Sequence, residues 1–274
     1  MDNKLSVDEV RNAVRETYAQ VARQNEHTAT TEAGCCSGSS CCAPEVASLQ
    51  SAEVISVGLG YSDEDVAVIP EGANMGLGCG NPQAIAALKP GEVVVDLGCG
   101  GGFDAFLAAR QVGPDGRVIG VDMTPDMISK ARKNVEKSDF KNVDIRLGEI
   151  EHLPIADSSV DVIISNCVIN LSPEKRQVFA DAFRVLKSGG RLAISDIVAT
   201  APLPESALND PALISGCLSG ASTIDDHLAM LEAAGFVDIV ITEKPESRAF
   251  IADWAPGSGL EEYVVSATIE ARKE

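Results

Sequence analysis

The sequence predicts an α/β protein with a mostly parallel sheet, and three observations support that prediction. Short apolar strands alternate with helices from residue 91 onward. A glycine-rich turn at 98–102 joins the first of these strands to a helix. With 45% hydrophobic and 23% charged residues, the chain can form a substantial core. Strands that alternate with helices are typical of parallel sheets covered by helices on both faces.

The elements follow one another in a clear order. A first helix starts at a capping box, Ser6 to Glu9, and places Val10, Val14 and Tyr18 at helical spacing. Residues 28–44 indicate a flexible loop, and a glycine-rich connection covers 51–82. Helices are predicted at 103–112, 125–138, 174–186 (ended by Gly189-Gly190) and 222–234 (ended by Gly235). Strands are predicted at 93–97, 117–122, 143–147, 160–166, 191–198, 238–241 and 263–269. The last two strands, with no helix between them, indicate an antiparallel return at one edge.

The charge balance excludes several classes of partner. The chain has 22 basic and 41 acidic residues, a formal net charge of −19. Such a surface repels phosphate backbones and anionic lipids, so we expect no nucleic-acid or membrane partner. No apolar run approaches the roughly 18 residues of a membrane span, and no apolar segment follows the first four residues. We therefore expect a soluble, cytoplasmic protein, and we make no prediction of its oligomeric state.

The cysteines require a chemical explanation, because four of the eight lie within residues 35–42. In a reducing compartment, clustered cysteines indicate metal binding or redox chemistry more often than structural disulfides. Cys36 and Cys41 have the spacing of half a zinc site, but no matching second half follows nearby, so no structural metal is expected. A tether without chemistry is the alternative for this segment. The eight are Cys35, Cys36, Cys41, Cys42, Cys79, Cys99, Cys167 and Cys217.

The strongest local motif is the glycine-rich turn, which reads Asp-Leu-Gly-Cys-Gly-Gly-Gly from Asp96. A dinucleotide-binding loop would have a third spaced glycine where this chain has Phe103, which weakens that interpretation. The pattern Asp-x-Gly-x-Gly-x-Gly instead matches the first motif of class I methyltransferases. Asp122 ends the second strand, 22 residues after Gly100, where a carboxylate can accept hydrogen bonds from a ribose. A plain turn is the alternative, but strand, helix and Asp122 together argue against it.

Two cysteines are predicted to meet at the same edge of the sheet. Ligands of open α/β sheets bind outside the carboxyl ends of the strands. Cys167 directly follows the fourth strand, and Cys217 lies beyond the fifth. The alternative for both is a small buried residue in the core. Cys99, inside the glycine loop, is expected to pack rather than react, and Cys79, between two glycines, is a turn residue or a functional thiol.

Three segments resemble arsenite S-adenosylmethionine methyltransferases. They are Ser-Asn-Cys-Val-Ile-Asn-Leu at 165–171, Gly-Ala-Asn-Met-Gly-Leu-Gly-Cys-Gly at 72–80 and Gly-Cys-Leu-Ser-Gly at 216–220. The first is specific to the family, whereas the glycine loop alone is not. The resemblance runs from about Val14 to Gly235 and includes the N-terminal Cys-Cys pairs. It implies a Rossmann-like class I fold and methylation of arsenite and methylated As(III) species, with S-adenosylmethionine as donor, for arsenic detoxification.

The resemblance also implies roles for individual residues. Cys167 and Cys217 would be the main As(III) ligands, Cys42 a further ligand or disulfide partner, and Cys79 a redox or relay cysteine. Methylation formally oxidises the arsenic, so a thiol reductant or thioredoxin is implied for turnover. The residues expected at the cofactor are Asp96, Gly98, Cys99, Gly100, Asp122, Met123, Glu149, Ile150 and Asn166.

The chemistry of arsenic agrees with this assignment. Trivalent arsenic is soft and suits thiolates, which leave its lone pair free to attack a sulfonium methyl group. No general base is required, so the presence of only three histidines is no obstacle.

Three regions are predicted: a helix and Cys-rich segment at 1–72, a cofactor-binding core at 73–200, and a region at 201–274 that completes the sheet and covers the arsenic site. Two other functions stay open. A methyltransferase for a small organic acceptor of the quinone or sterol type would share the core, but it would have no reason for cysteines at both 167 and 217. A non-catalytic As(III)-binding protein would have no reason for an intact glycine loop with Asp122.

Overall fold

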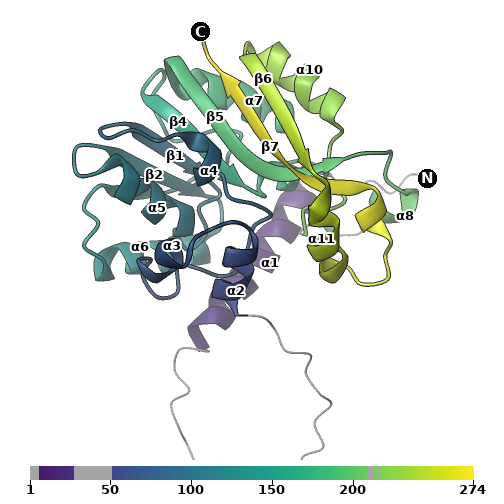
Figure 1. The fold of residues 1–274 in the computed structure, drawn as a ribbon, viewed down its shortest axis with the longest axis horizontal. Coiled ribbons are helices and arrows are strands. Elements are labelled where there is room, and N and C mark those ends of the chain that lie inside the picture. The colour runs from purple at the N-terminus through teal and green to yellow at the C-terminus, as the bar shows by residue number, and fades with distance from the viewer. Residues whose placement is uncertain (1–5, 28–50, 209–212, 215) are drawn as a thin grey trace, which may run out of the picture.

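A computed structural model describes residues 6–27, 51–208, 213–214 and 216–274 of the chain. Its seven strands are β1 (Val93–Leu97), β2 (Arg117–Asp122), β3 (Val143–Leu147), β4 (Val160–Asn166), β5 (Leu186–Ala199), β6 (Val237–Lys244) and β7 (Val264–Arg272). They form one sheet in the order β3-β2-β1-β4-β5-β7-β6 (Figure 1). Strands β1 to β5 pair in parallel, whereas β7 is antiparallel to both β5 and β6. The predicted fold class, a mostly parallel seven-stranded sheet, is therefore confirmed.

Helices cover both faces of this sheet because alternate side chains of each strand point to opposite sides. On one face, Val95 belongs to a buried cluster with Phe179 and Leu231. On the other face, Val94 packs with Ala105 and Ala108. The helices that carry these contacts are α5 (Phe103–Val112), α7 (Lys175–Val185) and α10 (Ile224–Ala234), and α6 (Pro125–Lys137) packs beside β2 and β3.

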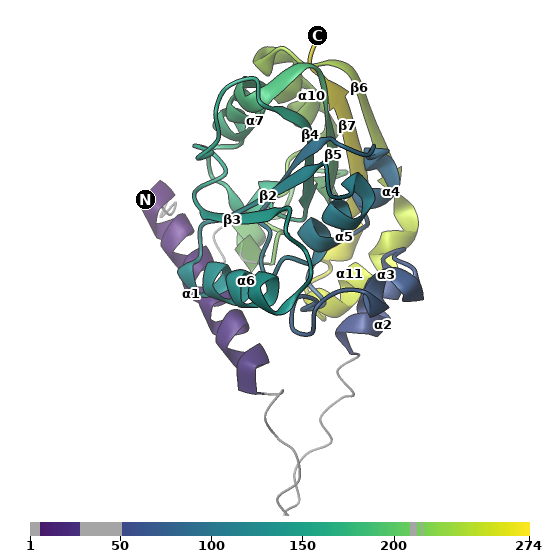
Figure 2. The same cartoon turned by 90° about the vertical axis from the view of Figure 1, so that its left-hand side faces the viewer.

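The remaining helices lie mainly around the carboxyl ends of the parallel strands, as Figures 1 and 2 show for α1, α2 and α11. Among the described helices, none has the length and apolar character needed to cross a membrane. The helices are α1 (Val7–His27), α2 (Ala52–Gly58), α3 (Asp63–Ala67), α4 (Gln83–Ala86), α8 (Glu205–Leu208) and α11 (Arg248–Trp254), with short 3-10 turns η2 (Ile169–Leu171), η3 (Pro245–Ser247) and η4 (Leu260–Glu262).

Helix α1 is anchored to the core by arginines that point toward acidic residues of other elements. Arg11 pairs with Glu151 at 3.2 Å and with Glu174 at 2.7 Å. Arg23 pairs with Asp126, in the first turn of α6, at 2.8 Å. These pairs hold α1 across the edge of the sheet where the strands end.

Two local predictions were wrong, and the glycine-rich connection contains helices that were not predicted. Gly189-Gly190 does not end α7, which stops at Val185; the two glycines lie inside β5, where Gly189 donates to the carbonyl of Lys273 at 2.7 Å. The strands β6 and β7 are not joined directly, because α11 lies between them. The connection at 51–82 contains α2 and α3, whose N-caps are Ser51 and Ser62. The division into three regions stays a prediction.

Candidate active site

A cavity of about 890 Å³ opens at the carboxyl ends of the parallel strands. The glycine loop forms one wall, and α1, α2 and α11 contribute side chains to the others. Its volume falls in the range of small-molecule sites, and its place at the strand ends is where open α/β sheets bind ligands.

The glycine loop fits tightly against its neighbours, which explains its composition. Gly98 has a φ of +64°, and a Cβ there would lie 2.5 Å from the Cγ2 atom of Val168. A Cβ on Gly101 would lie 2.8 Å from the carbonyl oxygen of Ala73. Only glycine can occupy these positions without displacing the chain, so the backbone itself is exposed to a ligand in the cavity.

Two buried carboxylates stand beside this loop. Asp122 accepts hydrogen bonds from the amides of Gly100 (3.0 Å) and Thr124 (2.8 Å), and burial raises its pKa. Asp96 is 3% exposed, and its Oδ2 has no hydrogen-bond partner among the described residues. Burial, followed by the charges of Asp104 and Asp122, raises the pKa of Asp96 well above its ordinary value. The pair therefore offers acceptor atoms, one of them unused, to a cationic or hydroxyl-bearing ligand.

The other residues predicted to contact the cofactor differ in whether they line the cavity. Met123 and Ile150 line the cavity. Cys99 also borders it, and its side chain belongs to a buried cluster, as the packing interpretation predicted. Glu149 is not among the lining residues of the described chain, and its carboxylate pairs with Arg15 of α1. Their contacts to a cofactor stay predictions.

Asn166, the last residue of β4, lines the cavity and uses its amide to hold a neighbouring loop. Its Oδ1 accepts from the amide of Cys79 at 3.0 Å, and its Nδ2 donates to the carbonyl of Gly80 at 2.9 Å. The same Nδ2 lies 3.0 Å from the hydroxyl of Tyr61 and 3.3 Å from Asp104. Asn166 therefore ties the loop that carries Cys79 to the end of β4.

The predicted meeting of Cys167 and Cys217 is what the fold produces. Both are buried, both line the cavity, and the Sγ of Cys217 lies 2.8 Å from the carbonyl oxygen of Cys167. Both have a left-handed backbone, with φ of +59° and +62°, which is uncommon outside glycine. The two thiols converge from segments 50 residues apart.

The thiols are held in their neutral form by their surroundings. A hydrogen bond with Cys217 lowers the pKa of Cys167, but its hydrogen bond with Cys79, burial and Asp196 together raise it well above the ordinary value. The hydrogen bond with Cys167, together with burial, raises the pKa of Cys217, whereas a hydrogen bond with Tyr18 opposes this shift. A substrate that binds thiolates must therefore displace their protons.

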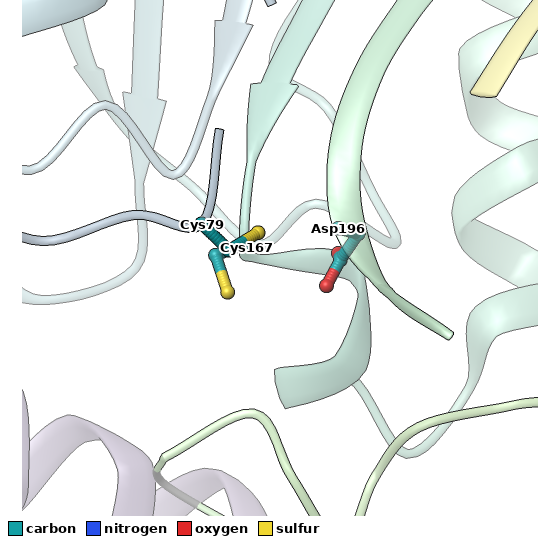
Figure 3. Close-up of side chains that lie close together, drawn as sticks. All are labelled: Cys79, Cys167 and Asp196. Atoms are coloured by element: carbon teal, nitrogen blue, oxygen red, sulfur yellow. The ribbon is translucent and has the colours of Figure 1, made fainter. Parts of the chain in front are cut away.

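Cys79 lies beside Cys167, next to a carboxylate that sequence reasoning missed. The Sγ atoms of Cys79 and Cys167 and a carboxylate oxygen of Asp196 all lie within 4.8 Å of one another (Figure 3). Asp196 is fully buried near the end of β5, and burial raises its pKa to about 6. An acidic residue within the mainly apolar run 192–199 is a signal that could have identified it.

A second missed residue is Tyr18, which α1 brings into the cavity wall and against the cluster that contains Cys167 and Cys217. In the sequence it was one apolar position of a helix, and nothing local marks it as part of a site. Cys42 and the other cysteines of 35–42 lie outside the described residues.

Comparisons with known proteins point to one family. A family model described as a methyltransferase domain matches residues 88–235. The arsenite methyltransferase of Halobacterium salinarum is 56% identical over 267 residues, which cover 97% of this chain and 67% of that protein. The arsenite methyltransferase of Aquipseudomonas alcaligenes is 41% identical over 183 residues, 64% of this chain and 52% of that protein.

A solved structure agrees with the sequence matches. The crystal structure of an arsenic(III) S-adenosylmethionine methyltransferase from Chlamydomonas reinhardtii superposes with a TM-score of 0.61 at 33% identity, covering 80% of this chain and 73% of that one. The matched part of this chain thus spans about two thirds of the Halobacterium protein and about half of the Aquipseudomonas protein. Because sequence identity and fold agree over most of its length, the chain belongs to the arsenite methyltransferase family.

Proposed function

We propose that this protein transfers a methyl group from S-adenosylmethionine to trivalent arsenic held by cysteine thiolates. The observation that carries the proposal is the contact between Cys167 and Cys217 in the wall of the cavity that also contains the glycine loop. The substrate named for the relatives, arsenite, is the soft trivalent species that such a thiol pair suits.

The residues around the glycine loop fit S-adenosylmethionine. The unpartnered Oδ2 of Asp96 offers an acceptor to an ammonium group or a hydroxyl, and Asp122 offers a carboxylate to a ribose. Gly98 and Gly100 leave the backbone bare for close approach. When bound, S-adenosylmethionine supplies a sulfonium methyl group, which is an electrophile for the arsenic lone pair. Burial raises the pKa of both Asp96 and Asp122, and a positively charged ligand beside them would favour their ionised forms and be attracted by them.

The thiols prepare the substrate. As each sulfur–arsenic bond forms, the thiol proton combines with a hydroxyl group of arsenite and leaves as water. Two such exchanges at Cys167 and Cys217 fix the arsenic in the cavity wall with its lone pair exposed. Holding both reactants in one cavity can contribute several kcal/mol, up to about 7–11, to lowering the barrier.

Turnover requires a reductant. Methylation uses the arsenic lone pair and leaves the arsenic formally pentavalent, so release of a trivalent product needs two electrons. We propose that a thiol reductant or thioredoxin supplies them through cysteines of this chain, which pass from two thiols to a disulfide. Cys79, hydrogen-bonded to Cys167, is the described candidate for this relay, and Cys42 the candidate outside the described residues. The proposed setting is arsenic detoxification in the cytoplasm.

The test is methyl transfer from radiolabelled S-adenosylmethionine, with arsenite and a thiol reductant present or omitted. We expect label in an arsenic species only when arsenite is present. Replacing Cys167 or Cys217 by Ser should abolish the transfer while leaving the affinity for S-adenosylmethionine nearly unchanged. Cofactor binding without arsenite-dependent transfer would favour an organic acceptor, and arsenite binding without cofactor binding would favour a non-catalytic arsenic-binding protein.

A further inference from the structure

Cys167 is hydrogen-bonded to both of the other described thiols at the site. Its partners are Cys217 and Cys79. Cys167 and Cys217 line the cavity, whereas neither Cys79 nor Asp196 is among the lining residues of the described chain. Cys79 is 1% exposed and Asp196 is 0% exposed. Cys167 and Cys217 therefore form a cavity-facing pair, whereas Cys79, Cys167 and Asp196 form an inner group, and the two share Cys167.

The inner group has the dimensions of a metal site. Its three ligand atoms, the two sulfurs and a carboxylate oxygen, lie within 4.8 Å of one another (Figure 3). A tetrahedral zinc ion with bonds of about 2.3 Å to sulfur and 2.0–2.2 Å to oxygen separates its ligands by roughly 3.6–3.8 Å. The remaining difference of about 1 Å would have to be closed by rotation of the two cysteine side chains, because hydrogen bonds hold the Asp196 carboxylate.

The carboxylate of Asp196 is already oriented by the fold. Its Oδ1 accepts from the Nδ2 of Asn170 at 2.9 Å and from the amide of Ile197 at 2.7 Å. Its Oδ2 accepts from the amide of Ile169 at 2.9 Å. The backbone of Asn170 adds a further hydrogen bond, so the roughly four lone-pair sites of the carboxylate are largely used, and a cation would have to replace one of these bonds. Hydrogen bonds that fix a ligating carboxylate in this way are typical of metal sites.

We propose that Cys79, Cys167 and Asp196 form a binding site for a soft or borderline divalent cation, with Zn²⁺ and Cd²⁺ as the fitting ions. Two thiolates and one carboxylate suit such a cation, whereas As(III) is better served by sulfur alone and reaches Cys167 from the cavity side with Cys217. The two thiols release their protons to solvent as the cation binds. Since both ligands need Cys167, the cation competes with arsenic. The site goes beyond the proposed methylation and does not depend on it.

The probe is Cd²⁺ alone, followed by the ultraviolet charge-transfer absorption of cadmium thiolates, without arsenite or S-adenosylmethionine. The full chain is used with Cys35, Cys36, Cys41 and Cys42 replaced by Ser, because that cluster would bind Cd²⁺ itself. We expect one Cd²⁺ per chain in this background. Adding Cys79→Ser should weaken binding by more than about 100-fold, beyond the 10–100-fold that outer-shell changes cost at metal sites.

The matched control is Cys217→Ser in the same background, which should change Cd²⁺ affinity by less than about threefold. Asp196→Asn should weaken binding at least tenfold, with folding checked by circular dichroism; if that variant does not fold, the Cys79 and Cys217 variants decide alone. Absence of Cd²⁺ binding in the background, or loss on Cys217→Ser with retention on Cys79→Ser, would overturn the proposal. Neither result would bear on methylation, because arsenite and the methyl donor are absent from the experiment.

Discussion

Asn166 gives the sharpest test, because sequence and structure assign it different roles. The sequence places it among the cofactor contacts, whereas its amide is used to hold the loop around Cys79. Replacing it by Ala removes the acceptor of the Cys79 amide (3.0 Å) and the donor to the Gly80 carbonyl (2.9 Å). It also removes contacts to Tyr61 and Asp104. The variant should therefore release the loop that carries Cys79 from the end of β4.

The size of the effect follows from the groups left unpaired. A buried backbone donor or acceptor without a partner costs about 1–3 kcal/mol. Two such groups, on Cys79 and Gly80, should lower the free energy of unfolding of Asn166→Ala by about 2–6 kcal/mol, measured by urea denaturation. The rate of arsenite methylation should fall more than tenfold, because Cys79 no longer stays beside Cys167. The affinity for S-adenosylmethionine should stay within about threefold.

The matched control is Asn142→Ala. Asn142 also donates two hydrogen bonds to backbone carbonyls, those of Ala109 (3.2 Å) and Gly113 (2.8 Å), but it is not among the residues that line the cavity. It should lose stability to a similar degree and keep its methylation rate at temperatures where it is folded. If Asn166→Ala instead lost cofactor affinity tenfold and kept its thiol chemistry, Asn166 would be a cofactor contact and the positioning argument would be wrong.

Three further predictions follow from single groups. Gly98→Ala should lower S-adenosylmethionine affinity at least tenfold in calorimetric titrations, because its Cβ would clash with Val168. The control is Gly91→Ala, which has a φ of +84° and open space around it and should cost only about 1–2 kcal/mol of stability. Tyr18→Phe keeps the ring but removes the hydrogen bond that lowers the pKa of Cys217. The pH profile of Cys217 alkylation should therefore move to higher pH, and an unmoved profile would exclude that bond. Burial lowers the pKa of His227 from 6.5 to about 4. Its contribution to the free energy of unfolding is therefore fully present above pH 6.5 and is lost as the pH falls toward 4. Between pH 7.5 and 5, the wild type should lose about 2 kcal/mol more stability than His227→Leu in urea denaturation, and equal losses would contradict this.

The parts of the fold that the sequence predicted correctly depend on local signals. β1, β2 and α5 have the predicted bounds, because an apolar run, a glycine turn and a helix start follow one another within a few residues. Gly189-Gly190 misled the prediction because pairing with the end of β7, a contact across more than 80 residues, overrides the local tendency of glycine to end a helix. Propensity is a weak guide where such pairing is available.

The same distinction between local signals and long-range contacts holds for the candidate site. The edge rule for open sheets brought Cys167 and Cys217 together from their places after two strands, with no knowledge of the loops between them. The contacts of Asn166 with Cys79, 87 residues away, and of α1 with the cavity depend on how distant segments dock. No pattern within either segment encodes such docking, so Tyr18 and the positioning role of Asn166 were beyond sequence reasoning.

The backbone at Cys167 and Cys217 gives a reason why the fold favours arsenic, which bridges two thiols, over a reagent that reacts with a single thiol. A left-handed conformation costs a non-glycine residue about 1–2 kcal/mol, and both Cys167 and Cys217 adopt it. Such strain persists only where the surroundings fix it. Here the amide of Cys167 donates to Ser195 at 2.8 Å, and the amide of Cys217 to Ile214 at 3.0 Å. With both backbones fixed, the two thiols stay in neighbouring positions, which suits a single bridging atom. Substitutions at Ser195 or Ile214 that shift these anchoring carbonyls should therefore weaken arsenite binding, measured by titration, more than they slow the alkylation of either thiol alone.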